Sequence, residues 1–480
     1  MTGYILAIDQ STQGTKAVLF DGDGTLVKRV DVPHRQIVNE QGWVSHDPME
    51  IYHNLLQAAV QVIREAGIDK GEVKALGISN QRETTAIWDQ NGCPIQDAVV
   101  WQCARATDIA KRHEDAAQMI YEHTGLPLSP YFPACKMAWL LENTEPHQGI
   151  HLGTMDSWLV YKLTGGKSFK TDHSNASRTQ LFNLKTLQWD EELCRMFGIP
   201  LAALPEVCGS DACFGYTDLE GLLDKPIPIH AVLGDSHAAL YGQGCHRPGM
   251  VKATYGTGSS IMMNIGDGFR QSTSGLATSL AWGIGGGVNY VLEGNINYTG
   301  AVITWLKDDV GLIQNPAETE ALAREANPAD ATVLIPAFSG LGAPHWKSET
   351  KAMLYGMTRT TGRAEIVKAG LESIAYQIDD VLAAMTSDCG GAIAELRVDG
   401  GPTRNGYLMQ FQSDLSGVTV SAASLEELSA LGVGYLAGQT VGLYDNDVFR
   451  NIQYRCFRSE RTQEWQKEKR KIWTDMIRRI

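Results

Sequence analysis

Three kinds of pattern are missing from this sequence of 480 residues. No apolar run reaches the roughly 18 residues that a membrane-spanning helix needs. The nine cysteines never occur in C-x-x-C spacing, which leaves zinc and redox motifs without support and favours free thiols in a reducing cytosol. A net charge of −14 argues against a general nucleic-acid or anionic-membrane surface. We therefore expect a cytoplasmic protein whose partner is neither a nucleic acid nor a membrane.

The length of the chain predicts two domains, because single hydrophobic cores seldom extend beyond about 250–300 residues. The segment Gly242-Gln-Gly244 is typical of a hinge between domains. We therefore expect one domain at 1–243 and another at 244–480. Strand-like and helix-like patterns alternate in both halves, which predicts the α/β class. The basic tail 461–479 mixes its cations with acids and apolar residues, and this favours a solvated C-terminal helix over a nucleic-acid patch.

The first apolar run ends at Asp9, turns through small hydroxyl and amide residues, and returns as a second apolar run to Asp21. This pattern predicts a strand–turn–strand hairpin. Hydroxyls, backbone N–H groups and Lys16 suit phosphate oxygens, and the carboxylate at the strand end suits a hydrated magnesium ion. A related pattern at 251–263 surrounds Gly256-Thr-Gly258. Two such hairpins, half a chain apart, indicate a duplicated nucleotide-binding architecture and hence an ATP-using enzyme.

Several short motifs occur in a fixed order along the chain. They include Trp43-Val-Ser-His-Asp-Pro48, Asn80-Gln-Arg-Glu-Thr-Thr85, Asn175-Ala-Ser-Arg-Thr179, Gly234-Asp235, Thr254-Tyr-Gly-Thr-Gly258, Gly340-Leu-Gly-Ala-Pro344 and Val398-Asp-Gly-Gly401. In order and spacing they resemble the FGGY family of carbohydrate kinases, and most closely its glycerol kinases. The resemblance implies two ribonuclease-H-like (actin-like ATPase) domains around a catalytic cleft. It also implies transfer of the γ-phosphoryl group of ATP to a hydroxyl of a small polyol or sugar.

On the donor side, the resemblance implies that Asp9 holds Mg²⁺ through water. It places these further residues at the nucleotide: Thr12, Gln13, Gly14, Lys16, Thr257, Gly300, Thr304, Gly401 and Asn405. Glycerol kinases usually carry Arg where Lys16 stands, so the charge is kept and the bidentate fork is lost. Thr304 replaces the usual Gln, which leaves its contact near the adenine open. An ordinary hairpin turn is the alternative interpretation of residues 10–15.

Asp235 occupies the position of the family's catalytic aspartate. Its carboxylate is ionised at neutral pH and is therefore able to accept the proton of the acceptor hydroxyl. A helix N-cap is the alternative interpretation of this residue, since Asp fills that position well. His237, two residues later, is a weaker candidate for an acid or base, because a histidine at a helix start is more often structural.

Seven residues stand at positions that the resemblance assigns to the acceptor. They are Arg82, Glu83, Trp101, Tyr131, Asp235, Ser236 and Ser260. An adjacent Arg and Glu complement a hydroxyl that both donates and accepts, although a surface ion pair is the simpler interpretation. An aromatic wall suits the carbon atoms of the acceptor.

Ser236 and Ser260 stand where glycerol kinases carry Gln and Phe. Because serine is smaller than Gln or Phe, these replacements enlarge the pocket. They also remove part of its apolar wall and add two hydroxyl groups. This predicts a four- to six-carbon polyol or ketose as the acceptor. A true glycerol kinase with compensating side chains, which makes glycerol 3-phosphate, is the alternative.

A more distant alternative is an actin-like or chaperone-like ATPase whose nucleotide state controls a protein partner. Such a protein has no need for Arg82, Tyr131 and Asp235 together, and a chaperone would carry an added peptide-binding domain. A catalytically dead sensor is disfavoured because Asp9 and Asp235 are both present. From the family we expect a homodimer or homotetramer.

Overall fold

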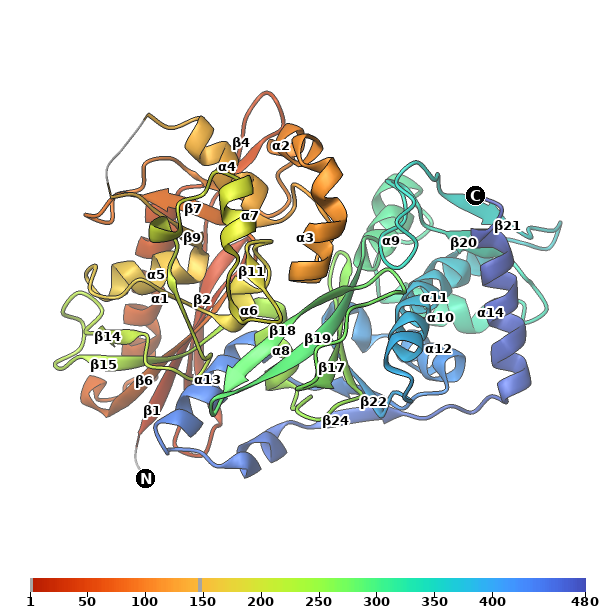
Figure 1. Cartoon of the computed structure of the whole chain (residues 1–480). Coiled ribbons are helices and arrows are strands. Elements are labelled where there is room, and N and C mark those ends of the chain that lie inside the picture. Colours follow the sequence, from red (N-terminus) through yellow and green to blue (C-terminus); the bar gives the residue numbers. More distant parts are fainter. Residues whose placement is uncertain (1–2, 146–148) are drawn as a thin grey trace.

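The computed structural model describes residues 3–145 and 149–480, which form two halves side by side (Figure 1). The first half is built on a six-stranded mixed sheet with the order β14-β15-β6-β1-β2-β3. Its strands are β1 Tyr4–Gln10, β2 Gly14–Phe20, β3 Leu26–Pro33, β6 Val73–Asn80, β14 Gly215–Thr217 and β15 Ile227–Gly234. β1 pairs antiparallel with β2 and parallel with β6, and β6 pairs parallel with β15. The predicted first hairpin is confirmed and forms the middle of this sheet.

The second half repeats this arrangement in a seven-stranded sheet with the order β18-β19-β17-β16-β22-β23-β24. Its strands are β16 Met250–Tyr255, β17 Ser259–Gly266, β18 Ala277–Ile284, β19 Gly287–Ile296, β22 Glu395–Asp399, β23 Val420–Ala423 and β24 Tyr454–Phe457. β16 pairs antiparallel with β17 and parallel with β22, just as β1 pairs with β2 and β6. A hairpin continued by parallel strands thus occurs twice, as the expected pair of ribonuclease-H-like domains requires.

A smaller sheet with the order β4-β5-β8-β7-β9 forms a cap on the first half. Its strands are β4 Ile37–Val38, β5 Val44–His46, β7 Thr85–Trp88, β8 Ala98–Val99 and β9 His151–Thr154. Helices α2 Thr107–Arg112, α3 Ala117–Thr124 and α4 Pro133–Glu142 share one buried apolar cluster with it. The segment between β8 and α4 carries Trp101 and Tyr131, so this cap positions the aromatic residues expected at the acceptor.

The remaining elements complete the two halves. The helices are α5 Met155–Leu163, α6 His173–Ala176, α7 Glu191–Met196, α10 Glu318–Glu325, α11 Arg363–Cys389 and α12 Gly406–Ser416. Three two-stranded ribbons pair β10 Lys170–Asp172 with β13 Glu206–Cys208, β11 Phe182–Asn183 with β12 Gln188–Trp189, and β20 Val333–Ile335 with β21 Met353–Tyr355. Helix α9, Gly300–Thr304, continues as a π-helical turn, Trp305–Asp309.

Helix α1, Pro48–Ala66, covers one face of the first sheet. The Asp47 carboxylate accepts the Met49 N–H, and Gly67 ends the helix with a left-handed φ of 67°. Apolar residues at helical spacing form one face of α1. This face packs in the core against the alternate side chains of β1, β2 and β6.

The other face of the first sheet is covered by a helix from near the end of the chain. Helix α13, Leu428–Thr440, is drawn blue in Figure 1 and lies against the red strands and α8, Asp235–Gly242. The shared buried core includes Ala7, Phe20, Leu233, Leu431 and Val433. A Cβ at Gly432 would lie 1.9 Å from the Ala238 carbonyl oxygen, so glycine permits this close approach. The division at 243/244 stays a prediction, and in space α13 belongs with the first sheet.

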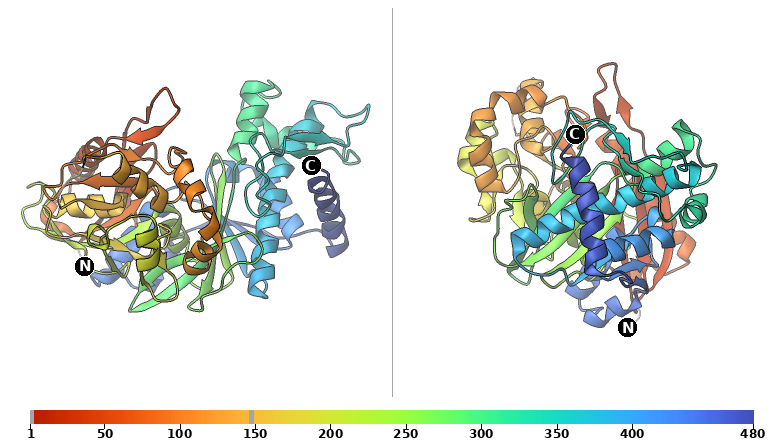
Figure 2. Two further views of the ribbon diagram at one scale, coloured as in Figure 1. Left: turned by 45° about the horizontal axis from the view of Figure 1, so that its top comes forward. Right: turned by 90° about the vertical axis from the view of Figure 1, so that its right-hand side faces the viewer.

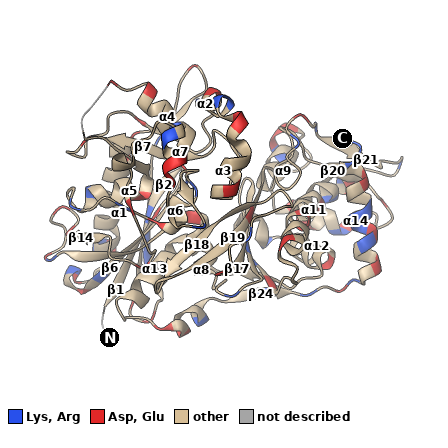
Figure 3. Cartoon of the chain, viewed as in Figure 1, with Lys and Arg blue, Asp and Glu red and all other residues tan. Residues whose placement is uncertain are grey.

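Helix α14, Gln463–Ile477, lies on the outside of the second half in both views of Figure 2. It buries Trp473 and Met476 in the second core and exposes charged residues of both signs, drawn blue and red in Figure 3. The sequence prediction of a solvated helix is therefore confirmed. Within the described ranges, none of the helices combines the length and apolarity needed to span a membrane. All nine cysteines are free thiols.

Candidate active site

The turn of the first hairpin lies between Gln10 and Gly14. The Ser11 N–H donates to the Gly14 carbonyl at 2.9 Å, which closes the turn. The Thr12 hydroxyl oxygen accepts the indole N–H of Trp101 at 3.0 Å, so the phosphate turn and the aromatic segment are in contact. Gln13 is exposed. A Cβ at Gly14 would lie 2.8 Å from the Val32 carbonyl oxygen, which explains the glycine by close packing against β3.

Asp9 lies at the end of β1 and is 6% exposed. Its carboxylate accepts the Ser79 hydroxyl at 3.0 Å and lies 3.5 Å from Lys16 Nζ. Lys16 Nζ is closer, at 3.0 Å, to Glu427, which also pairs with Arg29. Burial raises the pKa of Asp9; Lys16 opposes that shift, and the carboxylates of Glu427 and Asp235 add to it. Three carboxylates thus act on one another here, and Lys16 lies between two of them.

The donor set at Asp9 fits a hydrated magnesium ion. Mg²⁺ usually keeps several waters and binds one or two carboxylates together with substrate phosphates. Asp9 and Asp235 offer those carboxylates, and a cation between them would relieve the repulsion that raises the pKa of Asp9. Among residues 3–145 and 149–480, no three His, Cys, Asp or Glu side chains are grouped so that they could hold a metal ion.

The turn of the second hairpin, Gly256–Gly258, packs against the start of α9. The Thr299 N–H donates to the Thr257 carbonyl and the Gly300 N–H to the Gly256 carbonyl, both at 2.9 Å. Thr257 is exposed. A Cβ at Gly258 would lie 2.3 Å from the Ile296 carbonyl oxygen, so only glycine fits this turn without displacement.

A cavity of about 520 Å³ adjoins the second hairpin. All four residues expected near the nucleoside line it: Gly300, Thr304, Gly401 and Asn405. The Asn405 amide donates to the Thr319 hydroxyl at 3.0 Å, and its carbonyl oxygen accepts the Leu408 N–H at the start of α12. Asn405 therefore ties α10 to α12 at the rim of this cavity, and Thr304 is exposed there.

Asp235 is the first residue of α8, directly after β15. Gly234 occupies the N-cap position, so the alternative role of Asp235 as an N-cap is not the one observed. The Asp235 side chain is 37% exposed, and its Oδ1 lies 3.2 Å from Arg82 Nε. Ser236, which is partly exposed, donates its N–H to the same oxygen at 2.6 Å. The carboxylate is thus held at one oxygen while it remains accessible to solvent.

Arg82 and Glu83 are buried and do not pair with each other. Arg82 donates to both oxygens of Glu293, at 3.0 and 2.8 Å. Glu83 accepts from Arg178 at 2.7 Å, and Arg178 Nη1 also lies 2.7 Å from Glu293. Glu83 has a φ of 59°, an uncommon conformation for a non-glycine residue that fixes where this carboxylate points. These contacts form a chain of five charged groups whose signs alternate: Glu83, Arg178, Glu293, Arg82 and Asp235.

Arg178 and Glu293 were missed by the sequence reasoning. Arg178 lies within one of the family motifs, and Glu293 interrupts an apolar strand run, Val291-Leu-Glu-Gly294. A carboxylate in such a run requires a buried cationic partner, and this signal could have identified it.

A cavity of about 680 Å³ lies between the two halves, and we call it the acceptor cavity because two residues expected at the acceptor line it. Trp101 and Tyr131 line it, with their rings edge to face at 5.7 Å. Glu293 and Thr257 also line it, so it extends from the arginine cluster to the second hairpin. The Ser260 hydroxyl donates to Glu293 at 3.2 Å, which brings this predicted acceptor residue to the cavity wall.

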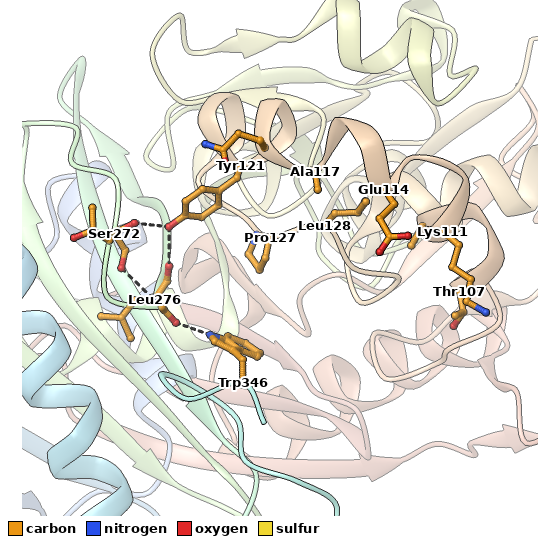
Figure 4. Close-up of a pocket in the computed structure, with 14 residues that line it drawn as sticks. Thr107, Lys111, Glu114, Ala117, Tyr121, Pro127, Leu128, Ser272, Leu276 and Trp346 are labelled. Atoms are coloured by element: carbon orange, nitrogen blue, oxygen red, sulfur yellow. Dashed lines mark hydrogen bonds between the residues drawn. The ribbon is translucent and has the colours of Figure 1, made fainter. Parts of the chain in front are cut away.

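Figure 4 shows a second cavity, of about 750 Å³, which shares Pro127 and Trp346 with the acceptor cavity. The Tyr121 side chain points at the segment 272–276 of the second half, and its hydroxyl donates to the Ser272 carbonyl at 2.6 Å. The Trp346 indole N–H donates to the Gly275 carbonyl at 2.7 Å. The Tyr121 contact ties the cap to the second half, and the Trp346 contact holds two segments of the second half together.

His237 is fully buried on α8, behind Asp235. Burial, followed by the Arg82 charge, holds its pKa well below the ordinary value. Its Nε2 lies 3.5 Å from the Ser279 hydroxyl. A neutral, enclosed imidazole agrees with the structural role that the sequence favoured.

Two family models match the chain over most of its length. Residues 4–242 match the N-terminal domain of the FGGY family of carbohydrate kinases, and residues 251–440 match its C-terminal domain. The matches end on either side of the predicted hinge.

Curated relatives and solved structures agree with these matches. The chain is 47% identical to glycerol kinase 1 of Thermotoga maritima, covering 94% of each chain. It is 46% identical to a glycerol kinase of Symbiobacterium thermophilum, over 92% of this chain and 90% of that protein. The crystal structure of Plasmodium falciparum glycerol kinase with ADP matches with a TM-score of 0.93 at 34% identity, covering 100% of this chain and 98% of that one. A xylulose kinase from Lactobacillus acidophilus, 21% identical with a TM-score of 0.89, shares the fold.

Proposed function

The chain belongs to the FGGY family of carbohydrate kinases, and on that premise we propose that it is a glycerol kinase, which makes glycerol 3-phosphate from glycerol and ATP. It is a phosphotransferase with an alcohol group as acceptor. The observation that carries the proposal is the position of Asp235. This accessible carboxylate is anchored on Arg82, and it lies close enough to Asp9, at the end of the first hairpin strand, for its charge to raise the pKa of Asp9.

ATP is the proposed phosphoryl donor. Its phosphates would lie between the turns at Thr12 and Thr257, with the nucleoside at the cavity that Gly300 and Asn405 line. Lys16 would leave Glu427 to face the phosphates. Mg²⁺ at Asp9 supplies neutralisation of phosphate charge when bound.

Asp235 is the proposed base. Phosphoryl transfer has a loose transition state, so positioning and charge stabilisation dominate its catalysis. Asp235 accepts the proton of the acceptor hydroxyl as the bond between that oxygen and phosphorus forms. The Arg82 contact fixes one carboxylate oxygen, and the accessible side of the group faces the acceptor.

Glycerol is the proposed acceptor because relatives that cover more than nine-tenths of the chain carry that activity in their names. These relatives weigh against the larger acceptor that the sequence predicted from Ser236 and Ser260. A four- to six-carbon polyol or ketose stays the second candidate on one observation: Ser260 places a hydroxyl on Glu293 at the wall of the acceptor cavity.

The test is an ADP-release screen of the purified protein with glycerol, tetritols, pentitols, pentuloses and hexuloses. Glycerol should give the highest kcat/KM, and mass spectrometry of the product should show one added phosphoryl group. Preference for a longer acceptor would replace the first candidate with the second. ADP release that no alcohol stimulates would refute the kinase proposal and favour the actin-like ATPase.

A further inference from the structure

Glu293 is the one acidic residue of β19, a strand of the second half, and its side chain is fully enclosed. Its two oxygens accept from both terminal nitrogens of Arg82, at 3.0 and 2.8 Å. Arg178 Nη1 lies 2.7 Å from one of these oxygens. Both arginines belong to the first half. A carboxylate of the second half therefore reaches across the cleft to hold two cations of the acceptor site.

The bidentate pair fixes more than the two nitrogens that it uses. A guanidinium group is planar, so binding both terminal nitrogens also sets the direction of the Nε–H bond. In Arg82, the Nε atom lies 3.2 Å from Asp235 Oδ1, in an ion pair. The distance between this guanidinium and Asp235 thus depends on where Glu293 holds the guanidinium.

Glu293 itself is held in its charged form. Burial alone would raise its pKa, but the charges of Arg178 and Arg82 outweigh burial and hold the pKa well below its ordinary value. A carboxylate that keeps its charge and spends both oxygens on guanidinium groups is a poor base. Its contribution to turnover must pass through its partners.

We propose that Glu293 is a positioning residue, which aims Arg82 at Asp235 so that the second half completes the acceptor site of the first. This inference rests on the proposed kinase function. If Glu293 only stabilised the fold, its removal would lower Tm alone. In a positioning role, removal of Glu293 also misplaces Asp235, and the resulting loss of activity depends on Arg82.

The kinetic test is a double-mutant cycle of Glu293→Gln and Arg82→Lys, with glycerol or the best acceptor from the screen. Glu293→Gln keeps the side-chain shape and removes the charge. We expect kcat/KM for the acceptor to fall about 100-fold, as displacements of about 1 Å from the reactive geometry do. The KM for ATP should stay within about twofold, because the nucleotide contacts are unchanged. The double variant should be no slower than Arg82→Lys alone.

Asp379→Asn is the matched control. Asp379 is a buried carboxylate that accepts from two Arg470 nitrogens, at 2.6 and 3.0 Å, between α11 and α14. This control should lower Tm as Glu293→Gln does and leave kcat unchanged. If the two losses in the double variant multiply, or if Asp379→Asn slows turnover equally, the proposal is wrong.

A crystal structure of Glu293→Gln decides the point without turnover. An Arg82 Nε that lies farther from Asp235 Oδ1 than the 3.2 Å of the wild type supports the proposal, and an unmoved Arg82 overturns it. A wild-type protein that phosphorylates no alcohol would refute the proposed function, while this structural result would still stand on its own.

Discussion

At the scale of single residues, charged partners hold the side chains of the cleft. Arg82 and Arg178 share Glu293, and Lys16 lies between Asp9 and Glu427. Buried ion pairs often add little net stability, because desolvation offsets the attraction. They do fix geometry. The ion pairs of the cleft therefore serve to orient the charged side chains and add little to the free energy of unfolding.

Asp235→Asn should keep the shape of the site and remove the base. We expect kcat to fall by about 10²–10⁴-fold, the usual contribution of a positioned base. ATP affinity, measured by calorimetry, should change little, because the loss lies in the transition state. The control is Asp224→Asn, an exposed surface carboxylate on the same half. Near-normal turnover in Asp235→Asn would remove this residue from the mechanism.

Lys16→Met should weaken ATP binding and leave the acceptor KM unchanged. The variant removes the cation that opposes the raised pKa of Asp9, and with it a partner for phosphate. We expect the KM for ATP to rise about tenfold, equal to the loss of one modest charge-assisted contact. Lys16→Arg keeps the charge and serves as the control. An unchanged KM for ATP in Lys16→Met would place this lysine outside the phosphate site.

Residues that act near their own motif could be predicted from sequence, and residues that act through distant partners could not. Asp9 and Asp235 each stand at the end of an apolar strand run, so their places at these strand ends follow from local pattern. Arg82 and Glu293 are 211 positions apart, and no local pattern joins them. The sequence likewise predicted that the adjacent Arg82 and Glu83 act together on one hydroxyl. In the structure Arg82 pairs with Glu293, and Glu83 pairs with Arg178.

At the scale of elements, the first hairpin depends on two histidines behind it. His34 Nε2 lies 3.0 Å from the Thr12 carbonyl, within the phosphate turn. Its ring packs edge to face on His46 at 4.7 Å. Burial, and then the His46 ring, lower the pKa of His34 to about 4 from its ordinary 6.5. A neutral His34 thus holds the turn in place.

This pair predicts acid sensitivity. In the unfolded chain His34 binds a proton below about pH 6.5, and in the folded chain only below about pH 4. The contribution of a neutral His34 to the free energy of unfolding is therefore fully present above about pH 6.5. It is lost as the pH falls from about 6.5 to about 4. At about pH 5 the loss from His34 is about 2 kcal/mol. The free energy of unfolding of His34→Gln, measured in urea at about pH 7.5 and pH 5, should fall less than that of wild type. An equal fall in both proteins would contradict this account.

The contact between α8 and α13 predicts a second effect. An alanine at Gly432 gains about 1 kcal/mol of helix propensity but meets the Ala238 carbonyl, which has no flexible end to yield. Overpacking costs about 1–3 kcal/mol, so we expect lower Tm for Gly432→Ala. Activity should fall as well, since α8 carries Asp235. Gly391→Ala, whose Cβ meets no atom within 4 Å, is the control. A Tm equal to that of wild type would show that α13 shifts freely.

Elements with strong local signals could be predicted closely. Asp47, Pro48 and Gly67 mark both ends of α1. Strand β20 ends at Ile335, because its partner β21 is only three residues long. The π-helical turn at Trp305–Asp309 has no signal in the sequence pattern, since it depends on packing around α9.

At the scale of the whole molecule, the two halves share more than a hinge. α13 lies on the first sheet, and Tyr121 and Glu293 join the halves around the acceptor cavity. The predicted homodimer or homotetramer stays a prediction, to be measured by sedimentation.

The shared core predicts that residues 1–243 do not fold alone. The first sheet would expose the face that α13 covers, including Phe20 and Leu233. We expect the isolated fragment to be aggregated or to lack a cooperative thermal transition by circular dichroism. The same fragment joined through a flexible linker to residues 424–443 should regain one. Cooperative unfolding of the fragment alone would show that α13 is dispensable.

The late position of α13 also bears on synthesis of the chain. Ribosomes add about 5–20 residues per second, so roughly 10–40 s separate the emergence of residue 243 from that of Thr440. Throughout that interval a nascent chain carries one finished face of its first sheet and one bare face. We expect a chaperone that shields apolar surface to bind these nascent chains and to leave only when the last third of the protein has been translated.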